Sequence, residues 1–288
     1  MKAKSIDELL RHLDGVVTVD GDIVTVRNEV ALRDKIDGLI QTAVFGEGIT
    51  RDTARWIIWE AAQGLGIYPA SIHQLYMAIG RGDVPTTFTV PAMNIRAMNY
   101  NSSRAVFRAA NKHNVGAMLF EIARSEIGYT GQRPMEYTTS VLAAAIKEGF
   151  RGPVFIQGDH FQISASRYKS AGDAEVQAVK DLMVEAVAAG FYNIDIDTST
   201  LVDRSEEHTS LSFPTLDEQQ RTNYTLCAEL TQYVRTIEPA GITISLGGEI
   251  GEVGHKNSTV EELDAFMQGY RRDLVRKAEP KTDLNKLD

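Results

Sequence analysis

The sequence predicts an α/β protein, a TIM-type (β/α) barrel of about five βα units that is incomplete and follows a mostly helical N-terminal extension. Two observations carry this prediction. From residue 86 onward, short β-branched or aromatic runs alternate with segments of helical apolar spacing, a pattern typical of parallel sheets and barrels. Polar residues also follow the end of each predicted strand, which is where barrel enzymes carry their active sites.

The N-terminal extension is predicted to span residues 1–84. Residues 16–26 alternate around Asp20-Gly21, a strong two-residue turn signal, so a small hairpin is expected there. The other patterns in this part have helical spacing, and the clearest cover residues 30–44, 50–65 and 69–80. We find no catalytic motif in them and expect a packing or oligomer surface.

The barrel domain is predicted to span residues 85–277. Its strands are expected at residues 86–90, 116–122, 153–156, 192–196 and 241–246. Helices are expected between and after them, at residues 102–113, 134–150, 173–189, 215–237 and 259–276, with a loop at 125–133. A complete barrel needs about 250 residues, so only part of one is expected. The Lys- and Asp-rich tail, residues 278–288, is expected to be disordered.

Composition limits the class of protein. A net charge of −9 argues against general nucleic-acid binding. No apolar run approaches the roughly 20 residues that a membrane span needs. The single cysteine, Cys227, cannot form an internal disulfide, and the N-terminal residues lack a secretory pattern. We therefore expect a cytoplasmic protein without a membrane or nucleic-acid partner.

The stretch at residues 152–162 is the most informative. Its apolar run Val154-Phe155-Ile156 stops at Gly158 and then presents a carboxylate and an imidazole, Asp159-His160. Other predicted strand ends carry Asn94, Glu121, Ser125, Asp195, Asp197, Thr198, Ser199 and Glu249. Carboxylates that converge on a histidine are typical of a divalent-metal site, and a free carboxylate can serve as general base. The alternative is that each is a polar turn or a helix N-cap.

Four motifs together resemble the class II, zinc-dependent ketose-bisphosphate aldolases, of which fructose-bisphosphate aldolase is the best-known member. The motifs are Val90-Pro91-Ala92-Met93-Asn94, Gly158-Asp159-His160, Ile196-Asp197-Thr198-Ser199 and Gly248-Glu249-Ile250-Gly251-Glu252-Val253-Gly254. The loop at residues 121–131 is also similar to the larger subunit of tagatose-bisphosphate aldolase, which is thought to support a catalytic partner.

The resemblance implies a role for each matched residue. His160 corresponds to a zinc ligand, Asp159 to the acid/base at the substrate's C4 hydroxyl, and Glu249 to a glutamate near a second metal position. The residues that correspond to substrate contacts are Asn94, Ser125 and Asp197. The implied cofactor is Zn²⁺ or another divalent metal, which would polarise the ketone of the substrate.

The chain departs from the family pattern in its histidines, and one segment is unusual in itself. The family's other two zinc histidines follow strands six and seven, and the sequence has no counterpart there. His255 lies on a loop after the fifth predicted strand, where it is either a ligand or a solvated loop residue. Residues 204–210 interrupt a strand-to-helix loop and resemble a translated sequencing adapter, so we hypothesise an artefactual insertion there.

The resulting prediction is a lyase of carbohydrate metabolism (glycolysis, if the substrate is the fructose ester). It would cleave fructose 1,6-bisphosphate, or a related ketose bisphosphate, to dihydroxyacetone phosphate and glyceraldehyde 3-phosphate. The alternatives are a non-catalytic barrel subunit that stabilises a partner aldolase, and an inactive copy shortened at its C-terminus. A phosphorylated sugar is the expected ligand. The expected assembly is a homo-oligomer or a pair with a related barrel subunit.

Overall fold

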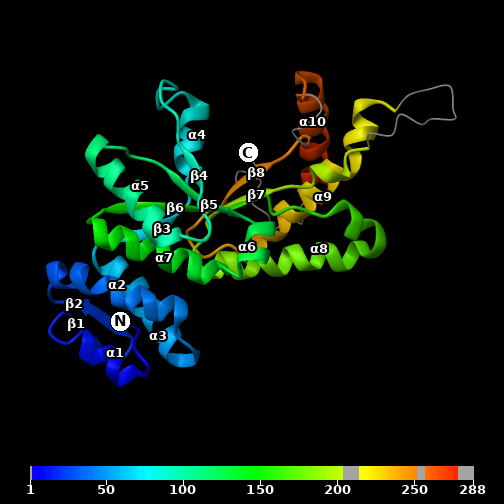
Figure 1. Ribbon diagram of the computed structural model, residues 1–288. Helices are drawn as coiled ribbons and strands as arrows, with labels where there is room; N and C mark the ends of the chain where they lie inside the picture. Colours follow the sequence, from blue (N-terminus) through cyan, green and yellow to red (C-terminus); the bar gives the residue numbers. More distant parts are fainter. Residues whose placement is uncertain (1, 204–213, 252–256, 278–288) are drawn as a thin grey trace. The chain divides into compact units, whose positions relative to one another are not determined.

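The computed structural model describes residues 2–203, 214–251 and 257–277 (Figure 1). The proposed insertion at 204–210, His255 and the tail at 278–288 lie outside the described residues. The chain forms two compact units. The first comprises residues 1–70, 78–157 and 188–191, and the second comprises residues 71–77, 158–187 and 192–288. The predicted division into residues 1–84 and 85–277 stays a prediction.

The N-terminal part of the first unit contains the expected hairpin. Strands β1 (Val17–Asp20) and β2 (Ile23–Val26) pair antiparallel, and Gly21 takes the positive φ of 57° that the turn requires. Three helices accompany the hairpin: α1 (Ile6–His12), α2 (Glu29–Phe45) and α3 (Gly48–Gly64) (Figure 1). Helix α3 contacts both other helices and strand β2. The helical spacing read from the sequence is confirmed here.

The first unit also contains parallel strands. Strand β4 (Ala92–Asn94) pairs with β5 (Leu119–Ala123), which is followed in the strand order by β6 (Gly152–Asp159). Strand β4 begins two residues after the segment predicted for it, residues 86–90. The other four parallel strands of the prediction lie within a few residues of their expected positions. An α/β fold with parallel strands alternating with helices, consistent with part of a TIM-type barrel, is therefore confirmed.

A further parallel strand lies where a helix was predicted. The helix expected at residues 69–80 is wrong in its first part, because β3 (Ile67–Ala70) pairs parallel with the start of β6. Helix α4 begins only afterwards and spans His73–Arg81. Pro69 has a fixed φ and no amide hydrogen, and the register places it opposite Val154. The non-local pairing with β6 therefore decides the structure of this segment.

Helices cover the parallel strands of the first unit. Helices α5 (Asn99–His113) and α7 (Pro134–Glu148) agree with the prediction. The loop predicted at 125–133 is wrong in part, because residues Arg124–Thr130 form helix α6. The carboxylate of Glu126 accepts a hydrogen bond from the amide of Ala123 at 2.9 Å, which stabilises the first turn of this helix.

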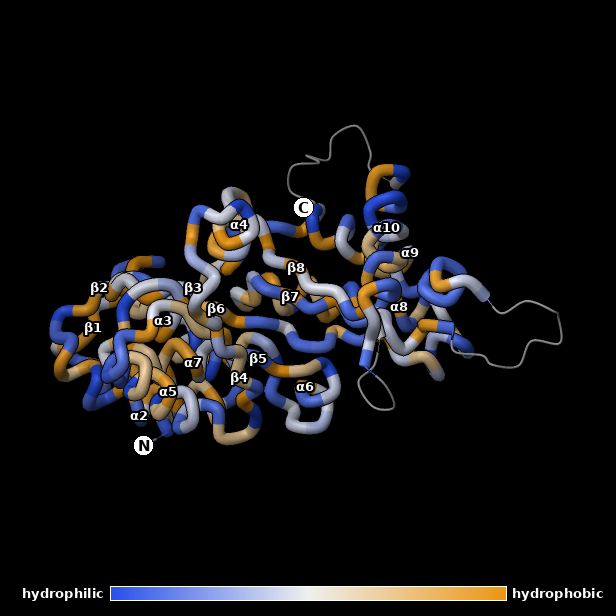
Figure 2. The backbone as a smooth tube through the Cα atoms, turned by 90° about the horizontal axis from the view of Figure 1, so that it is seen from above, coloured by the Kyte–Doolittle hydropathy of each residue, from blue (hydrophilic) through white to orange (hydrophobic). Residues whose placement is uncertain are grey.

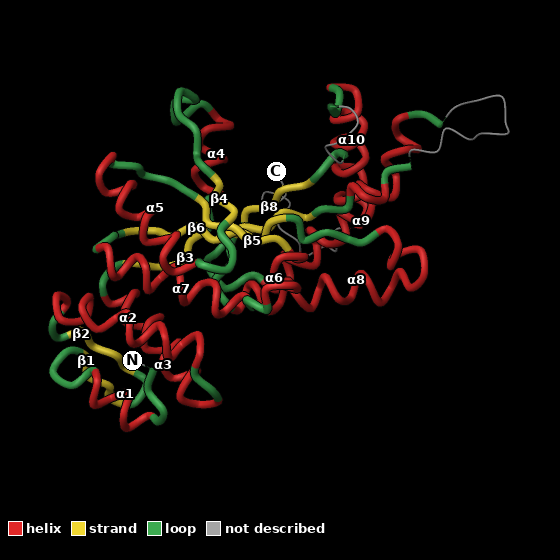
Figure 3. Tube along the Cα trace, viewed as in Figure 1, coloured by secondary structure: helices red, strands yellow, loops and turns green. Residues whose placement is uncertain are grey.

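The second unit contains the remaining strand–helix units. Strands β7 (Asn193–Ile196) and β8 (Ser245–Gly248) pair parallel. Helices α9 (Leu216–Ile237) and α10 (Val260–Lys277) pack on one another, as Figure 3 shows. The unit also contains most of α8 (Ala165–Ala188), which is interrupted by non-helical angles at Ala171, and the short 3₁₀ helix η1 (Ser199–Leu201).

A cluster of three phenylalanines forms part of the core of the first unit. The ring of Phe107, which is fully buried, lies 4.9 Å from the Phe120 ring and 4.8 Å from the Phe150 ring. These centroid distances are typical of favourable aromatic pairs. We predict that Phe107→Ala lowers the free energy of unfolding by about 3–5 kcal/mol, because it removes buried surface and leaves a cavity.

Urea denaturation followed by circular dichroism measures this change. The matched control is Phe45→Ala, because Phe45 is 68% exposed and its replacement is expected to cost about 0.5 kcal/mol or less. Equal effects of the two substitutions would contradict the packing described for Phe107.

Candidate metal centre

Gly158, the next-to-last residue of β6, leaves room for the ring of Phe161. A Cβ atom on Gly158 would lie 2.4 Å from the ring of Phe161, closer than any side chain tolerates. The buried ring of Phe161 therefore packs directly on the glycine backbone. The amide of Phe161 donates to the carbonyl of Asp195 at 2.9 Å, and the amide of Ile163 donates to the carbonyl of Asp197 at 2.8 Å. These bonds hold residues 159–163 alongside the end of β7.

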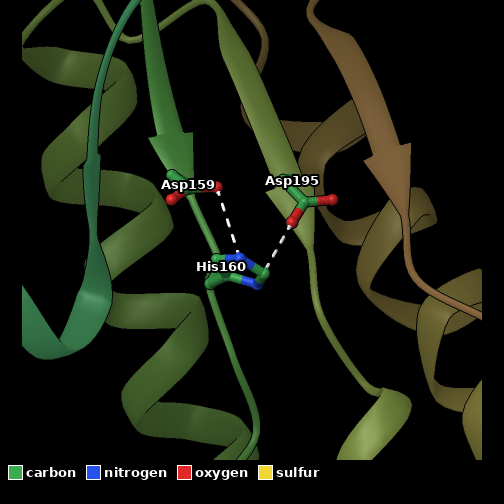
Figure 4. A group of neighbouring side chains, drawn as sticks. All are labelled: Asp159, His160 and Asp195. Atoms are coloured by element: carbon green, nitrogen blue, oxygen red, sulfur yellow. Dashed lines mark ion pairs between the residues drawn. The ribbon is translucent and has the colours of Figure 1, made fainter. Parts of the chain in front are cut away.

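His160 occupies the centre of a group of carboxylates. Its Nδ1 lies 3.1 Å from Oδ2 of Asp197 and 3.9 Å from Oδ2 of Asp195, and its Nε2 lies 3.8 Å from Oδ1 of Asp159. Figure 4 shows the imidazole between the side chains of Asp159 and Asp195. His160 has a φ of +40°, which is uncommon for a residue other than glycine. Backbone strain of this kind is concentrated at functional sites.

Asp197 fixes the orientation of the His160 ring. Its side chain is only 2% exposed. One of its oxygens accepts a hydrogen bond from Nε2 of Gln162 at 2.6 Å, and the other accepts from the amide and hydroxyl of Ser199 at 3.0 and 2.7 Å. Since a carboxylate only accepts, His160 in its neutral form donates from Nδ1 to Asp197 and keeps a lone pair on Nε2. This arrangement is the usual one for metal-binding histidines.

Asp195 provides a buried carboxylate opposite a glycine. It is paired in register with Gly247 of β8, and a Cβ atom at Gly247 would lie 2.9 Å from Oδ1 of Asp195. Oδ2 is buried and has no hydrogen-bond partner among the described residues. Burial and the negative charge of Glu249 raise the pKa of Asp195 to about 7, although His160 opposes the shift. An orphaned buried oxygen of this kind indicates a missing cation or proton.

Two further groups are affected by the same charges. Burial and the negative charge of Asp197 raise the pKa of Glu249. Burial alone would lower the pKa of His160, but the carboxylates of Asp159, Asp197 and Asp195 outweigh it and raise that pKa. Acidic groups that cannot all ionise without cost are stabilised by a bound cation. The cluster is therefore electrostatically suited to a divalent metal.

The donor atoms also satisfy the geometric requirement for a metal ion. Asp159, His160 and Asp195 each offer one ligand atom, and these atoms lie within 4.8 Å of one another. Two carboxylates and one imidazole suit Zn²⁺, Mn²⁺ or a similar divalent ion. The chemistry of this donor set and the orphaned oxygen of Asp195 both fit a metal ion.

The structure brings together most of the residues predicted for the site. Asp159, His160 and Asp197 are in contact around the imidazole, and Glu249 shares their electrostatic field. The prediction gave no role to Asp195 or to Gln162. The sequence signal for Asp195 was present, because residues two apart on a strand share a face and Asp195 is two residues before Asp197.

The other two predicted contacts belong to the first unit. Asn94 lies at the end of β4, where its side-chain amide donates to Glu126 at 2.8 Å. Ser125 is exposed in the first turn of α6. Arg96 forms an ion pair with the same Glu126 at 2.8 Å. The substrate-binding roles of Asn94 and Ser125 stay predictions.

Parallel strands with a carboxylate–histidine cluster at their ends define an α/β protein with a candidate divalent-metal centre. The profile of one family, described as "D-tagatose-1,6-bisphosphate aldolase subunit GatZ/KbaZ-like", matches residues 114–273. The chain belongs to this family. The match includes all the clustered acidic residues and His160, and this agrees with the tagatose-bisphosphate aldolase part of the resemblance seen in the sequence.

No curated protein matches this chain. A solved structure described as a probable tagatose 6 phosphate kinase from Sinorhizobium meliloti 1021 is 17% identical, with a TM-score of 0.47. The similarity covers 66% of this chain and 45% of that one, so the chain spans less than half of that protein's length. Within the described residues, we find no helix with the length and apolar character of a membrane span.

The raised pKa of Asp195 leads to a prediction about stability. A carboxyl group with a pKa near 7 in the folded state and near 3.9 in the unfolded state stabilises the fold fully below about pH 4. This contribution is lost as the pH rises toward 7. We predict that Asp195→Asn, measured in chelator, stabilises the protein relative to wild type by on the order of 2 kcal/mol more at pH 8 than at pH 4.5.

Chemical denaturation across that pH range provides the measurement. Asp22→Asn, in the exposed hairpin turn, is the control, and its stability curve should run parallel to that of wild type. An Asp195→Asn curve that also runs parallel would contradict the burial of an ionisable carboxyl group at this position.

Proposed function

We propose that the chain is an aldolase subunit that cleaves a ketose 1,6-bisphosphate to dihydroxyacetone phosphate and glyceraldehyde 3-phosphate. The observation that carries the proposal is that Asp159, Asp195 and the imidazole of His160 converge where β6 and β7 end. The family description supports D-tagatose 1,6-bisphosphate as substrate. The sequence motifs support its C4 epimer, fructose 1,6-bisphosphate. Cleavage of each bisphosphate can be measured separately.

Asp159 is the proposed acid/base, so of the three possible donor residues only His160 and Asp195 are assigned as metal ligands. The side chain of Asp159 is 17% exposed, so a substrate hydroxyl can reach it while much of the carboxylate stays shielded from water. It would accept the proton of the C4 hydroxyl as the C3–C4 bond breaks and the electron pair moves toward the C2 ketone. C3 of the released triose then takes up a proton from solvent, and Asp159 releases the proton that it accepted. A positioned base of this kind contributes about 10²- to 10⁴-fold to the rate.

The proposed metal ligands are Nε2 of His160 and the buried carboxylate of Asp195, with Glu249 close to them. A bound divalent cation would act as a Lewis acid on the ketone oxygen and so lower the cost of the negative charge that develops there. Asp197 acts through His160, because its hydrogen bond holds the ring with Nε2 free. The bonds that Gln162 and Ser199 give to Asp197 keep this support rigid.

A second candidate function is supported by two observations. The family description names a subunit, and His160 is the only imidazole in the cluster among the described residues. A non-catalytic subunit could retain the fold and the metal while a related barrel subunit performs the cleavage. We therefore propose that the chain assembles with such a partner or with itself, and that it works in the cytoplasm.

The test combines metal binding with turnover. We predict that Asp159→Asn lowers aldol cleavage by at least about 100-fold and leaves the zinc content of the purified protein nearly unchanged. We predict that His160→Ala lowers zinc affinity by at least about tenfold, because a direct ligand is removed. Zinc content is measured by atomic emission, and cleavage of each bisphosphate is coupled to triose-phosphate reduction.

The outcomes separate the two candidate functions. Chelator-sensitive turnover by the wild-type chain supports the enzyme. Zinc binding without turnover of either substrate favours the supporting subunit, which should then raise the activity or stability of an aldolase partner. If His160→Ala binds zinc as tightly as wild type does, the metal centre proposed here is wrong.

A further inference from the structure

Helix α9 carries two buried amide side chains near its N-terminal end. Gln220 is 2% exposed and Asn223 is fully buried, and both belong to the second unit. Figure 2 shows both hydrophilic and hydrophobic colours along α9, as expected of a helix that buries one face. Burying an amide is costly unless its donors and acceptor are paired. The partners of these two side chains therefore indicate what they do.

The side chain of Asn223 joins the segment after β7 to the segment after β8. Its nitrogen donates to the backbone carbonyl of Glu249 at 2.8 Å and to Oε1 of Gln220 at 2.9 Å. Its oxygen accepts from the hydroxyl of Thr198, which is also fully buried, at 2.6 Å. An amide nitrogen has two hydrogens, so both are used. Because a backbone carbonyl can only accept, the bond to Glu249 fixes the orientation of the amide.

Gln220 holds the next residue of the same segment. Its nitrogen donates to the backbone carbonyl of Ile250 at 2.8 Å. Two consecutive carbonyls after β8 are therefore bonded to buried amides of one helix. A shift of this segment would leave buried polar groups unpaired, which is unfavourable. The backbone at residues 249 and 250 is thus held firmly against α9.

The register of the strands shows what this segment presents. Strands β7 and β8 pair Asp195 with Gly247 and Ile196 with Gly248, so the next residue, Glu249, follows beside Asp197. Residues two apart on a strand share a face, and Gly247 closely approaches the carboxylate of Asp195. Glu249 therefore belongs to the face that carries the acidic cluster. Its negative charge is also one of the causes that raise the pKa of Asp195.

We propose that Asn223 is a positioning residue for the metal centre, because its amide fixes the backbone from which the Glu249 carboxylate approaches a bound cation. Gln220 supports the same segment through the neighbouring carbonyl. The hydroxyl of Thr198 ties the segment next to Asp197 to the same amide. The inference rests on the proposed metal centre and assigns to it a helix residue that is not itself a ligand.

Zinc titration of the full chain, in competition with a chromophoric chelator, tests the proposal. Asn223→Ala should lower the affinity for Zn²⁺ at least about tenfold, as loss of a group that orients metal-site residues typically does. Thr198 keeps an acceptor in this variant, because its hydroxyl also lies 3.0 Å from the backbone carbonyl of residue 223. Gln220→Met keeps the side-chain length without a donor and should lower the affinity in the same direction. It provides the test if Asn223→Ala fails to fold.

A matched control separates positioning from general stability. Thr231→Val also removes a buried polar group from α9, whose hydroxyl lies 3.0 Å from the hydroxyl of Tyr270. This variant should bind zinc like wild type. The visible absorption of bound Co²⁺ depends on the geometry of the metal site. It should change in Asn223→Ala and stay unchanged in Thr231→Val.

A double-mutant cycle with Glu249→Gln tests whether Asn223 acts through Glu249. In that background, Asn223→Ala should lower zinc affinity by no more than about twofold further, because the two residues belong to one interaction. A wild-type chain that binds no zinc would overturn the metal centre and this inference together. If wild type binds zinc, the inference alone is overturned when the folded variants at Asn223 and Gln220 bind like Thr231→Val. It is also overturned when Asn223→Ala has its full effect in the Glu249→Gln background.

Discussion

The surroundings of one imidazole constrain the candidate site more than any other feature. His160 faces Asp159, Asp195 and Asp197 within 3.9 Å, and one of these carboxylates has a buried oxygen with no hydrogen bond from any described residue. Withdrawing several negative charges from water is costly unless a cation or protons compensate. The raised pKa values of Asp195 and Glu249 express that cost. A divalent metal removes it and simultaneously gives the cluster a chemical role.

The local fold places these groups with little freedom. Gly158 allows Phe161 to pack on the backbone, and the amides of Phe161 and Ile163 are bonded to the carbonyls of Asp195 and Asp197. Asp159 and His160 are therefore held beside the strand that supplies the other carboxylates.

Local patterns in the sequence were sufficient to predict much of this arrangement. The hairpin, the long helices and the Gly158-Asp159-His160 strand end follow from turn signals, apolar spacing and residue chemistry that lie within a few positions of one another. Strand β3 was missed because it is short, contains Pro69 and depends on pairing with residues more than 80 positions away. Asp195 was named among the polar residues at the strand ends but was given no role, because its close contact with Gly247 arises only when β7 and β8 pair.

The central claim is that these side chains hold a divalent metal, and anomalous diffraction tests it most directly. Crystals grown with Zn²⁺ would be measured on both sides of the zinc absorption edge. The account predicts one strong difference peak about 2.0–2.3 Å from a ring nitrogen of His160 and from the carboxylate of Asp195. A well-ordered cluster without a peak, or zinc bound only by other side chains, would contradict it.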